Sequence, residues 1–254
     1  MLVMIENSKI MISFVTVVKN DLANLISTIE SIRRHAGYEY EHIIIDAESS
    51  DGTDEYIKDQ SDSRIKYRRG NDKGIYDAMN IGFSLVSINS SWLNFLNAGD
   101  LLLSNLNFLK SVDENLSSLI VGSYALIDNI DSKDDSLKFV TPKFLDNYSS
   151  CSSMPICHQA LIYSRSKFLG YSTVYSIISD YVNLIDHLKE WGYENINYQN
   201  NFKIGYLTGG YSYKFEDKRL AELLIFHVRS LNFTHIIYIS LRIVKKYMKN
   251  LYER

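Results

Sequence analysis

Apolar runs and helical repeats alternate over the first hundred residues. Short apolar segments rich in β-branched and aromatic residues predict strands at Lys9–Val18, Glu41–Asp46, Arg64–Arg68 and Trp92–Leu96. Between them, apolar residues at helical spacing predict helices over about 22–35, 54–60 and 74–88. Alternation of this kind gives a parallel sheet with right-handed crossovers and helices on both faces. We therefore expect an α/β protein.

The second half has a less regular pattern. Strands are predicted at Leu119–Leu126, Gln159–Tyr163 and Lys203–Leu207, and amphipathic helices at Asp180–Trp191, about 217–230 and about 234–252. The acidic segment 128–135 is expected to be an exposed turn, the serine-rich segment 147–154 a mobile loop, and Gly209-Gly210 a sharp turn. No internal repeat or clear linker divides the chain.

Composition narrows the class of protein. The chain has 254 residues, an apolar share of 46% and a formal net charge of −3. This size fits one domain or one domain with a tail, and the charge disfavours nucleic acid as a partner. Two cysteines, no leader pattern and no apolar run of about 18 residues indicate a reduced, cytoplasmic protein.

The predicted strand at Trp92 ends in Asn97-Ala98-Gly99-Asp100. Gly99 permits a sharp turn, and Asp100 then stands at the carboxyl end of a strand, where open α/β sheets bind ligands. Taken alone, this stretch is also explained by a turn whose aspartate caps the next helix. Four loops at the same sheet edge carry polar residues, and together they favour a binding site: Thr16, Asp46 with Ser49–Asp51, Asp72 with Lys73, and Asp100.

Four ordered motifs resemble the inverting glycosyltransferases of family two, which have the A-type nucleotide-sugar-binding fold. They are Ser13–Val18, Ile45–Thr53, Asn71–Asn80 and Phe95–Asp100, followed by shorter matches at Cys157–Gln159, Ser179–Tyr181 and Gly209–Ser212. The likeness is greatest to transferases of bacterial O-antigen and colanic acid synthesis. It implies one Rossmann-like catalytic domain over residues 1–212, with nucleotide-sugar binding over about 10–100 and the acceptor side over about 101–212. Residues 213–254 then form a C-terminal helical tail.

The resemblance assigns donor-side residues one by one. Thr16 and Asp46 match positions that hold the uridine, where a carboxylate accepts hydrogen bonds from the base or ribose. Lys73 matches a position near the diphosphate, and Asp72 and Asp77 either contact sugar hydroxyls or hold Lys73. The alternatives are a plain strand residue for Thr16, a turn cap for Asp46 and a structural ion pair for Asp77.

Asn97–Asp100 takes the place of the family's metal-binding Asp-X-Asp motif, with only the last carboxylate kept. Asp100 with phosphate oxygens and waters still suffices for octahedral Mn²⁺ or Mg²⁺. The metal would neutralise the leaving nucleoside diphosphate. Asn97 is expected beside the nucleotide sugar, and the change of motif leaves the metal requirement open.

Asp180 matches the family's catalytic base, although an aspartate at the start of a helix is also a good cap. His158 and Gln159 match an acceptor-side pair, while a lone histidine is often structural. The resemblance implies transfer of a hexose or N-acetylhexosamine from a UDP-sugar, with inversion, to an undecaprenyl-diphosphate-linked saccharide. There are two rival interpretations. One is a nucleotidyltransferase, which would need a glycine-rich phosphate loop that this sequence does not have after its first strand. The other is a non-catalytic sugar-nucleotide or glycan-binding subunit.

The C-terminal segment combines apolar residues over 233–244 with basic residues at Arg242, Lys245, Lys246, Lys249 and Arg254. An apolar helix with a basic end is typical of helices that lie in the membrane interface. The alternative is a helix packed on the domain or on a second subunit with a solvated basic face. Peripheral attachment to the inner face of the cell membrane is therefore an expectation that the sequence leaves open.

Overall fold

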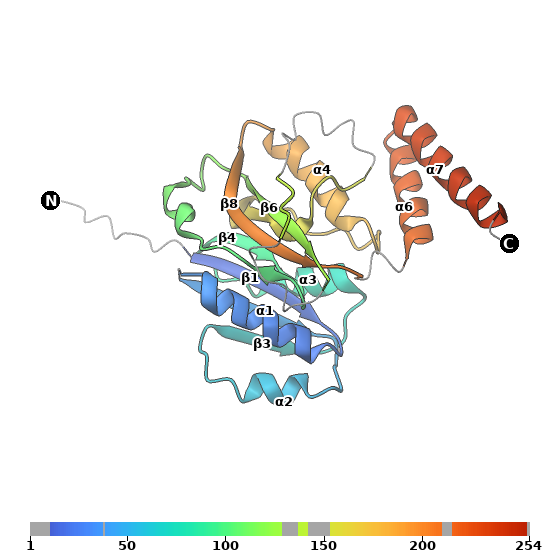
Figure 1. Cartoon of the computed structure of the whole chain (residues 1–254). Helices are drawn as coiled ribbons and strands as arrows, with labels where there is room; N and C mark the ends of the chain where they lie inside the picture. Colours follow the sequence, from blue (N-terminus) through green and yellow to red (C-terminus); the bar gives the residue numbers. More distant parts are fainter. Residues whose placement is uncertain (1–10, 38, 129–136, 142–152, 210–214, 253–254) are drawn as a thin grey trace.

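The computed structural model describes residues 11–37, 39–128, 137–141, 153–209 and 215–252. An α/β sheet dominates the molecule, and helices flank it (Figure 1). The strands are β1 (Met11–Val18), β2 (Tyr40–Asp46), β3 (Ile65–Arg69), β4 (Ser90–Phe95), β5 (Leu101–Leu102), β6 (Leu119–Ile127), β7 (Leu161–Ser164) and β8 (Ile196–Leu207). The helices are α1 (Leu22–His35), α2 (Thr53–Lys58), α3 (Ile75–Ser84), α4 (Ser179–Trp191), α6 (Glu216–Arg229) and α7 (Phe233–Tyr252), with short 3-10 turns η1 (Asn107–Ser111), η4 (His158–Ala160) and η5 (Arg165–Lys167).

The eight strands are ordered β3-β2-β1-β4-β7-β6-β8-β5. The pairs β2–β3, β1–β2 and β1–β4 are parallel, which confirms the expected arrangement of the first half. In the second half, β7 is antiparallel to β4 and β6, β8 is parallel to β6, and β5 is antiparallel to β8. The sheet is thus mostly parallel, as the sequence predicted, with antiparallel pairs on the β7–β5 side.

Burial on both faces of the sheet explains why β2 is apolar along its centre. Ile44 packs with Leu25 and Ile29 of α1 and with Ile57 of α2. Its neighbours on β2 belong to the main core on the opposite face, where α3 packs. Gly82 of α3 allows this close packing, because a Cβ there would overlap Val15 of β1 and lie 3.3 Å from Ile45 Cγ1 of β2. Strands covered on both faces are expected to read as continuous apolar runs.

The core extends into the C-terminal helices. Leu220 and Leu223 of α6 and Ile239 of α7 are buried in the same cluster as β1, β4 and β7. The two helices pack against each other and lie beside α4 at one side of the molecule (Figure 1). The expected division near residue 212 stays a prediction. The turn over 128–135, the loop over 147–154 and the motif Gly209–Ser212 also stay predictions, because they lie largely outside the described residues.

Candidate active site

The turn after β4 is built around Gly99. Its φ of +95° favours glycine, and a Cβ at this position would lie 2.7 Å from Leu207 Cδ2. The Asp100 N–H donates to the Asn97 carbonyl at 3.0 Å and closes the turn. The Thr28 hydroxyl of α1 accepts from the Gly99 N–H at 2.9 Å and donates to the Asp100 carbonyl at 2.9 Å. These contacts fix the backbone conformation that places Asp100 at the end of β4.

Asp100 is buried, with 4% of its surface exposed. Its Oδ2 accepts from Gln159 Nε2 at 2.7 Å, and its Oδ1 accepts from the Leu207 N–H at 3.1 Å. Burial raises the pKa of the Asp100 carboxyl to about 7, although both hydrogen bonds and nearby His158 oppose the rise. Asp100 therefore changes its protonation near neutral pH.

Asp180 lies in the first turn of α4 and is joined to the same region through His158. Asn97 Nδ2 lies 3.4 Å from His158 Nε2, and His158 Nδ1 lies 3.3 Å from Asp180 Oδ2. Asp180 Oδ1 accepts from the Tyr76 hydroxyl at 3.0 Å and from the Tyr181 N–H at 2.8 Å. If Asn97 donates to Nε2, then Nδ1 carries the ring proton and donates to Asp180.

A cavity of about 780 Å³ opens at the carboxyl ends of β1, β2 and β4. Six of the predicted site residues line this cavity: Asp72, Asn97, Asp100, His158, Gln159 and Asp180. Residues from distant parts of the chain meet here, because η4 and α4 bring the second half of the sequence against the turn after β4. A volume of this size falls within the range of small-ligand and cofactor sites.

Thr16 does not line the cavity. Its side chain is fully buried, and its hydroxyl donates to the Leu96 carbonyl at 2.6 Å and accepts from His42 Nε2 at 2.8 Å. Burial lowers the pKa of His42 to about 3, so His42 is neutral and the network is uncharged. Thr16 is thus a buried strand residue, and the adjacent Val17 and Val18 form the cavity wall, so its expected contact with the uridine stays a prediction.

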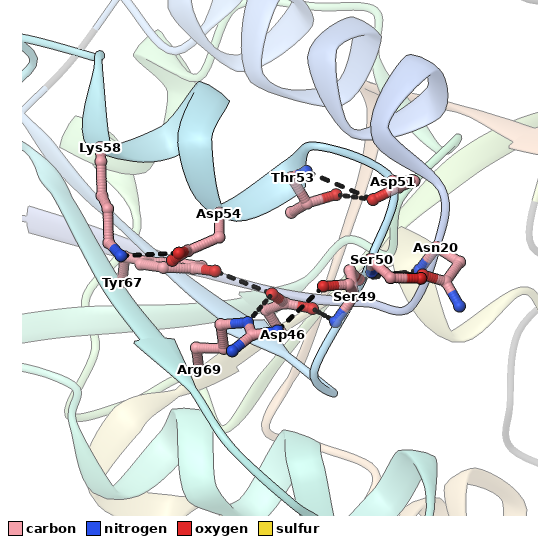
Figure 2. A network of polar contacts seen from close by, with 10 residues as sticks. All are labelled: Asn20, Asp46, Ser49, Ser50, Asp51, Thr53, Asp54, Lys58, Tyr67 and Arg69. Atoms are coloured by element: carbon pink, nitrogen blue, oxygen red, sulfur yellow. Dashed lines mark hydrogen bonds and ion pairs between the residues drawn. The ribbon is translucent and has the colours of Figure 1, made fainter.

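Asp46 is also fully buried and belongs to a separate network of hydrogen bonds and ion pairs (Figure 2). Its carboxylate accepts from the Ser49 N–H at 2.8 Å and from the Tyr67 hydroxyl at 2.7 Å, and Arg69 Nε lies at 3.5 Å. Burial and the hydrogen bond to Asp46 raise the pKa of Tyr67, which keeps its proton. Asp46 thus holds the β2–α2 turn, and its neighbours Ile45 and Ala47 line the cavity.

The three polar residues predicted around the start of α3 are placed differently. Asp72 lines the cavity, and its Oδ1 accepts from the Gly74 N–H at 2.8 Å. Asp77 Oδ2 accepts from the Lys73 N–H at 2.9 Å, so the contact joins Asp77 to the backbone of Lys73 at the start of α3. The Lys73 side chain is exposed and is not among the residues that line the cavity.

Sequence reasoning missed several residues of the site. Tyr76 is a motif residue whose hydroxyl also lies 2.8 Å from the Ile177 carbonyl, and burial raises its pKa well above the usual value. In the sequence, Thr28 is indistinguishable from an ordinary helix residue. The Leu207 N–H is a backbone group, and no sequence motif indicates its contact with Asp100. Lys19 and Tyr206 line the cavity as well. The position of Tyr76 within a motif was the one available signal.

The residues present fit a divalent cation in part. The carboxylate of Asp100 and the amide oxygen of Asn97 are ligands that Mg²⁺ and Mn²⁺ accept, and Asn97 Oδ1 is buried without a hydrogen-bond partner. Within the described ranges, no three His, Cys, Asp or Glu side chains converge as a metal cluster. A cation here would therefore depend on oxygens of a bound phosphate.

Structures with a similar fold bind nucleotide sugars. Staphylococcus aureus TarS residues 1–349 in complex with UDP-GlcNAc superposes over 88% of this chain and 67% of its own, with a TM-score of 0.62 and 14% identity. The mannosyltransferase PcManGT from Pyrobaculum calidifontis, in complex with GDP-Man and Mn²⁺, covers 90% of this chain and 68% of its own, with a TM-score of 0.61 and 14% identity. These matches confirm the predicted glycosyltransferase A-type fold.

The family is shown by a match to a family profile, and sequence relatives carry related names. PGL/p-HBAD biosynthesis glycosyltransferases of Mycobacterium tuberculosis and Mycobacterium bovis are 27% identical over 181 residues, which is 67% of this chain and 67% of theirs. The specific likeness to O-antigen and colanic acid transferases stays a prediction. The profile of Glycosyl transferase family 2 matches residues 13–168. More than half of the chain matches this profile, and the chain therefore belongs to Glycosyl transferase family 2 and is a glycosyltransferase.

Proposed function

We propose that this protein is an inverting glycosyltransferase that moves a hexose or N-acetylhexosamine from a nucleotide sugar, preferably a UDP-sugar, to a lipid-linked saccharide. One observation carries the proposal: Asp180 and Asp100 line the same cavity and are linked by His158, Asn97 and Gln159. A base and a diphosphate-binding turn on one cavity are what a single displacement requires.

The base side of the cavity contains Asp180. Its carboxylate takes the proton of the acceptor hydroxyl while that oxygen attacks the anomeric carbon, and the bond to the nucleoside diphosphate breaks. His158 and the Tyr76 hydroxyl fix the orientation of the carboxylate through contacts of 3.3 and 3.0 Å. Attack from the face opposite the leaving group inverts the anomeric centre, so an α-linked donor gives a β-linked product.

The donor side lies at the carboxyl ends of β1 and β2. Val17, Val18 and Ala47 offer apolar surface and backbone groups to a nucleoside, and Asp72 offers a carboxylate. Asp46, Thr16 and Asp77 serve this surface indirectly, by holding the strand, turn and helix beside it. Support for a nucleotide sugar comes from the similar structures that bind UDP-GlcNAc and GDP-Man.

A divalent cation fits the turn after β4. Asp100 and the Asn97 amide oxygen would hold it together with diphosphate oxygens, and when bound it supplies Lewis-acid stabilisation of the leaving group. Gln159 and the Leu207 N–H keep the Asp100 carboxylate in place. The Mn²⁺ in the mannosyltransferase structure supports this part of the proposal.

The acceptor is proposed to be attached to lipid, in surface-polysaccharide or glycolipid synthesis at the inner face of the membrane. One stripe of α7 is apolar and exposed, at Phe233, Ile237, Leu241, Val244 and Met248. Such a stripe suits shallow insertion into a bilayer surface. Among the helices of the described residues, none has the length and apolar character that a membrane span demands.

The test is hydrolysis of a panel of UDP-, GDP- and dTDP-sugars, each with Mn²⁺, with Mg²⁺ and with EDTA. We expect slow, cation-dependent release of one nucleoside diphosphate, which names the donor and shows that the Asn97–Asp100 turn suffices for the cation. Tight binding with no release, even with added lipid-linked acceptors, would favour a non-catalytic sugar-nucleotide-binding subunit. Absence of binding to every nucleotide would refute the proposed function.

A further inference from the structure

The carboxylate of Glu222 on α6 accepts hydrogen bonds from the backbone that immediately precedes α4. Glu222 Oε1 accepts from the Ser176 N–H at 3.0 Å and from the Ser176 hydroxyl at 2.8 Å. Glu222 Oε2 accepts from the Ile177 N–H at 2.9 Å and from the Ile178 N–H at 3.3 Å. Three successive backbone donors and a hydroxyl therefore converge on one side chain of α6.

These donors belong to the start of the helix that carries Asp180. Ile178 stands at the N-cap position of α4 and has no side-chain capping bond of its own. An isoleucine side chain offers no oxygen, so the unpaired N–H groups at the helix start need other acceptors. Glu222 is the acceptor for the Ile178 N–H and for the two N–H groups that precede it, and its negative charge is also favourable at a helix N-terminus.

The same segment forms part of the cavity wall. Ser176 and Ile177 line the cavity, and the Ile177 carbonyl lies 2.8 Å from the Tyr76 hydroxyl that also contacts Asp180. The segment is thus held from two sides, by Glu222 at its N–H groups and by Tyr76 at a carbonyl. A shift of this segment would move Asp180 relative to His158.

α6 is itself fixed against α4. Leu220 and Leu223 are buried, and the ring of Phe226 lies 5.6 Å from that of Tyr181. His227 Nε2 lies 3.1 Å from the Tyr181 hydroxyl. These contacts give Glu222 a rigid base from which to hold the segment before Asp180.

We propose that Glu222 is a positioning residue for the reaction: its carboxylate sets the place of Asp180 through the backbone of Ser176–Ile178. This inference rests on the proposed role of Asp180 as the base. It also places one essential part of the catalytic arrangement in the C-terminal helices, beyond residues 13–168 that match the family profile. The C-terminal helices are then part of the enzyme's active-site scaffold.

The experiment compares Glu222→Gln, Glu222→Asp and the control Glu216→Gln in the full chain. Glu216 lies on the same helix, pairs with Lys246 and makes none of the contacts to Ser176–Ile178. We measure kcat and KM for the hydrolysed donor, nucleotide affinity by calorimetry, and amide hydrogen exchange over 174–182. Gln keeps the length but loses one acceptor oxygen, and Asp keeps the charge but shortens the reach.

Both Glu222 variants are expected to lose about 10- to 100-fold in kcat with unchanged KM and nucleotide affinity, and to exchange the amides of Ser176–Ile178 faster. Glu216→Gln is expected to match the unaltered protein. Equal kcat in Glu222→Gln and Glu216→Gln would overturn the inference. Parallel loss of kcat, nucleotide affinity and melting temperature would also overturn it, because Glu222 would then act on stability alone. If the unaltered protein turns over no donor, the proposed function fails first and the inference with it.

Discussion

At the scale of single residues, the cavity contains two carboxylates in different surroundings. Asp100 is buried and has its pKa raised to about 7. Asp180 is half-buried and receives hydrogen bonds from the Tyr76 hydroxyl and the Tyr181 N–H. One site therefore offers a carboxyl that gains from a nearby cation and a second carboxylate whose orientation is fixed by hydrogen bonds.

The raised pKa of Asp100 predicts a pH-dependent cost to stability. The folded protein keeps the proton up to about pH 7, whereas the unfolded chain releases it near 3.8. Folding therefore binds a proton between these values, and stability falls as pH rises through this window. Asp100→Asn removes this cost. The free energy of unfolding of the variant, relative to that of the unaltered protein, should therefore rise by on the order of 2–3 kcal/mol from pH 5 to pH 8.

The measurement is urea unfolding in EDTA at both pH values. The control is Asp186→Asn, whose side chain in the unaltered protein is 52% exposed and pairs weakly with Lys189 at 3.6 Å. The stability difference between this control and the unaltered protein should change little between the two pH values, because both keep Asp100. A stability difference between Asp100→Asn and the unaltered protein that does not vary with pH would contradict the assignment.

At the scale of elements, the sequence predicted the type of every long helix and the central strands, because their apolar spacing is local information. The predicted and observed elements differ where tertiary contacts decide the boundary of a strand. The strand expected at Gln159–Tyr163 begins two residues later, since His158–Ala160 form the turn η4 that presents His158 and Gln159 to the cavity. The strand expected at Lys203–Leu207 begins at Ile196, because its polar first half pairs in parallel with β6.

The exposed stripe of α7 predicts binding to a bilayer surface. Ile237 and Leu241 are 62% and 63% exposed, one helical turn apart, and Lys245 follows on the exposed side. Replacing both with glutamine removes two apolar side chains from the contact and should weaken sedimentation with anionic vesicles about tenfold or more. Ionic strength should weaken the binding as well.

The matched control replaces Ile88 and Leu116 with glutamine, since both are exposed and lie outside the C-terminal helices. The control should sediment with vesicles as the unaltered protein does. Unchanged binding by the α7 variant would contradict the membrane proposal. Loss of a dimer in that variant, measured by light scattering, would instead assign the stripe to a second copy of the chain.

At the scale of the whole molecule, the parallel pairing of β1–β4 followed from the strand–helix alternation, since strands joined by helical crossovers run in the same direction. The pairing of β5–β8 did not follow, because antiparallel neighbours far apart in sequence are set by packing. The residues of the candidate site likewise fall into those that motifs indicated and those that only tertiary contacts bring in. Motifs located Asp100, His158 and Asp180, whereas the contact of Glu222 with the α4 start spans 44 to 46 residues and carries no local signal.

Asp180 is proposed to be the base of a glycosyl transfer in this cavity. The most direct test is Asp180→Asn, assayed for nucleotide binding and for turnover of the donor that the panel identifies, with and without acceptor. The variant keeps the size of the side chain and removes the basic oxygen, so transfer should fall by about 10²- to 10⁴-fold while nucleotide affinity stays the same. Near-normal transfer by Asp180→Asn would contradict the account and remove Asp180 from the mechanism.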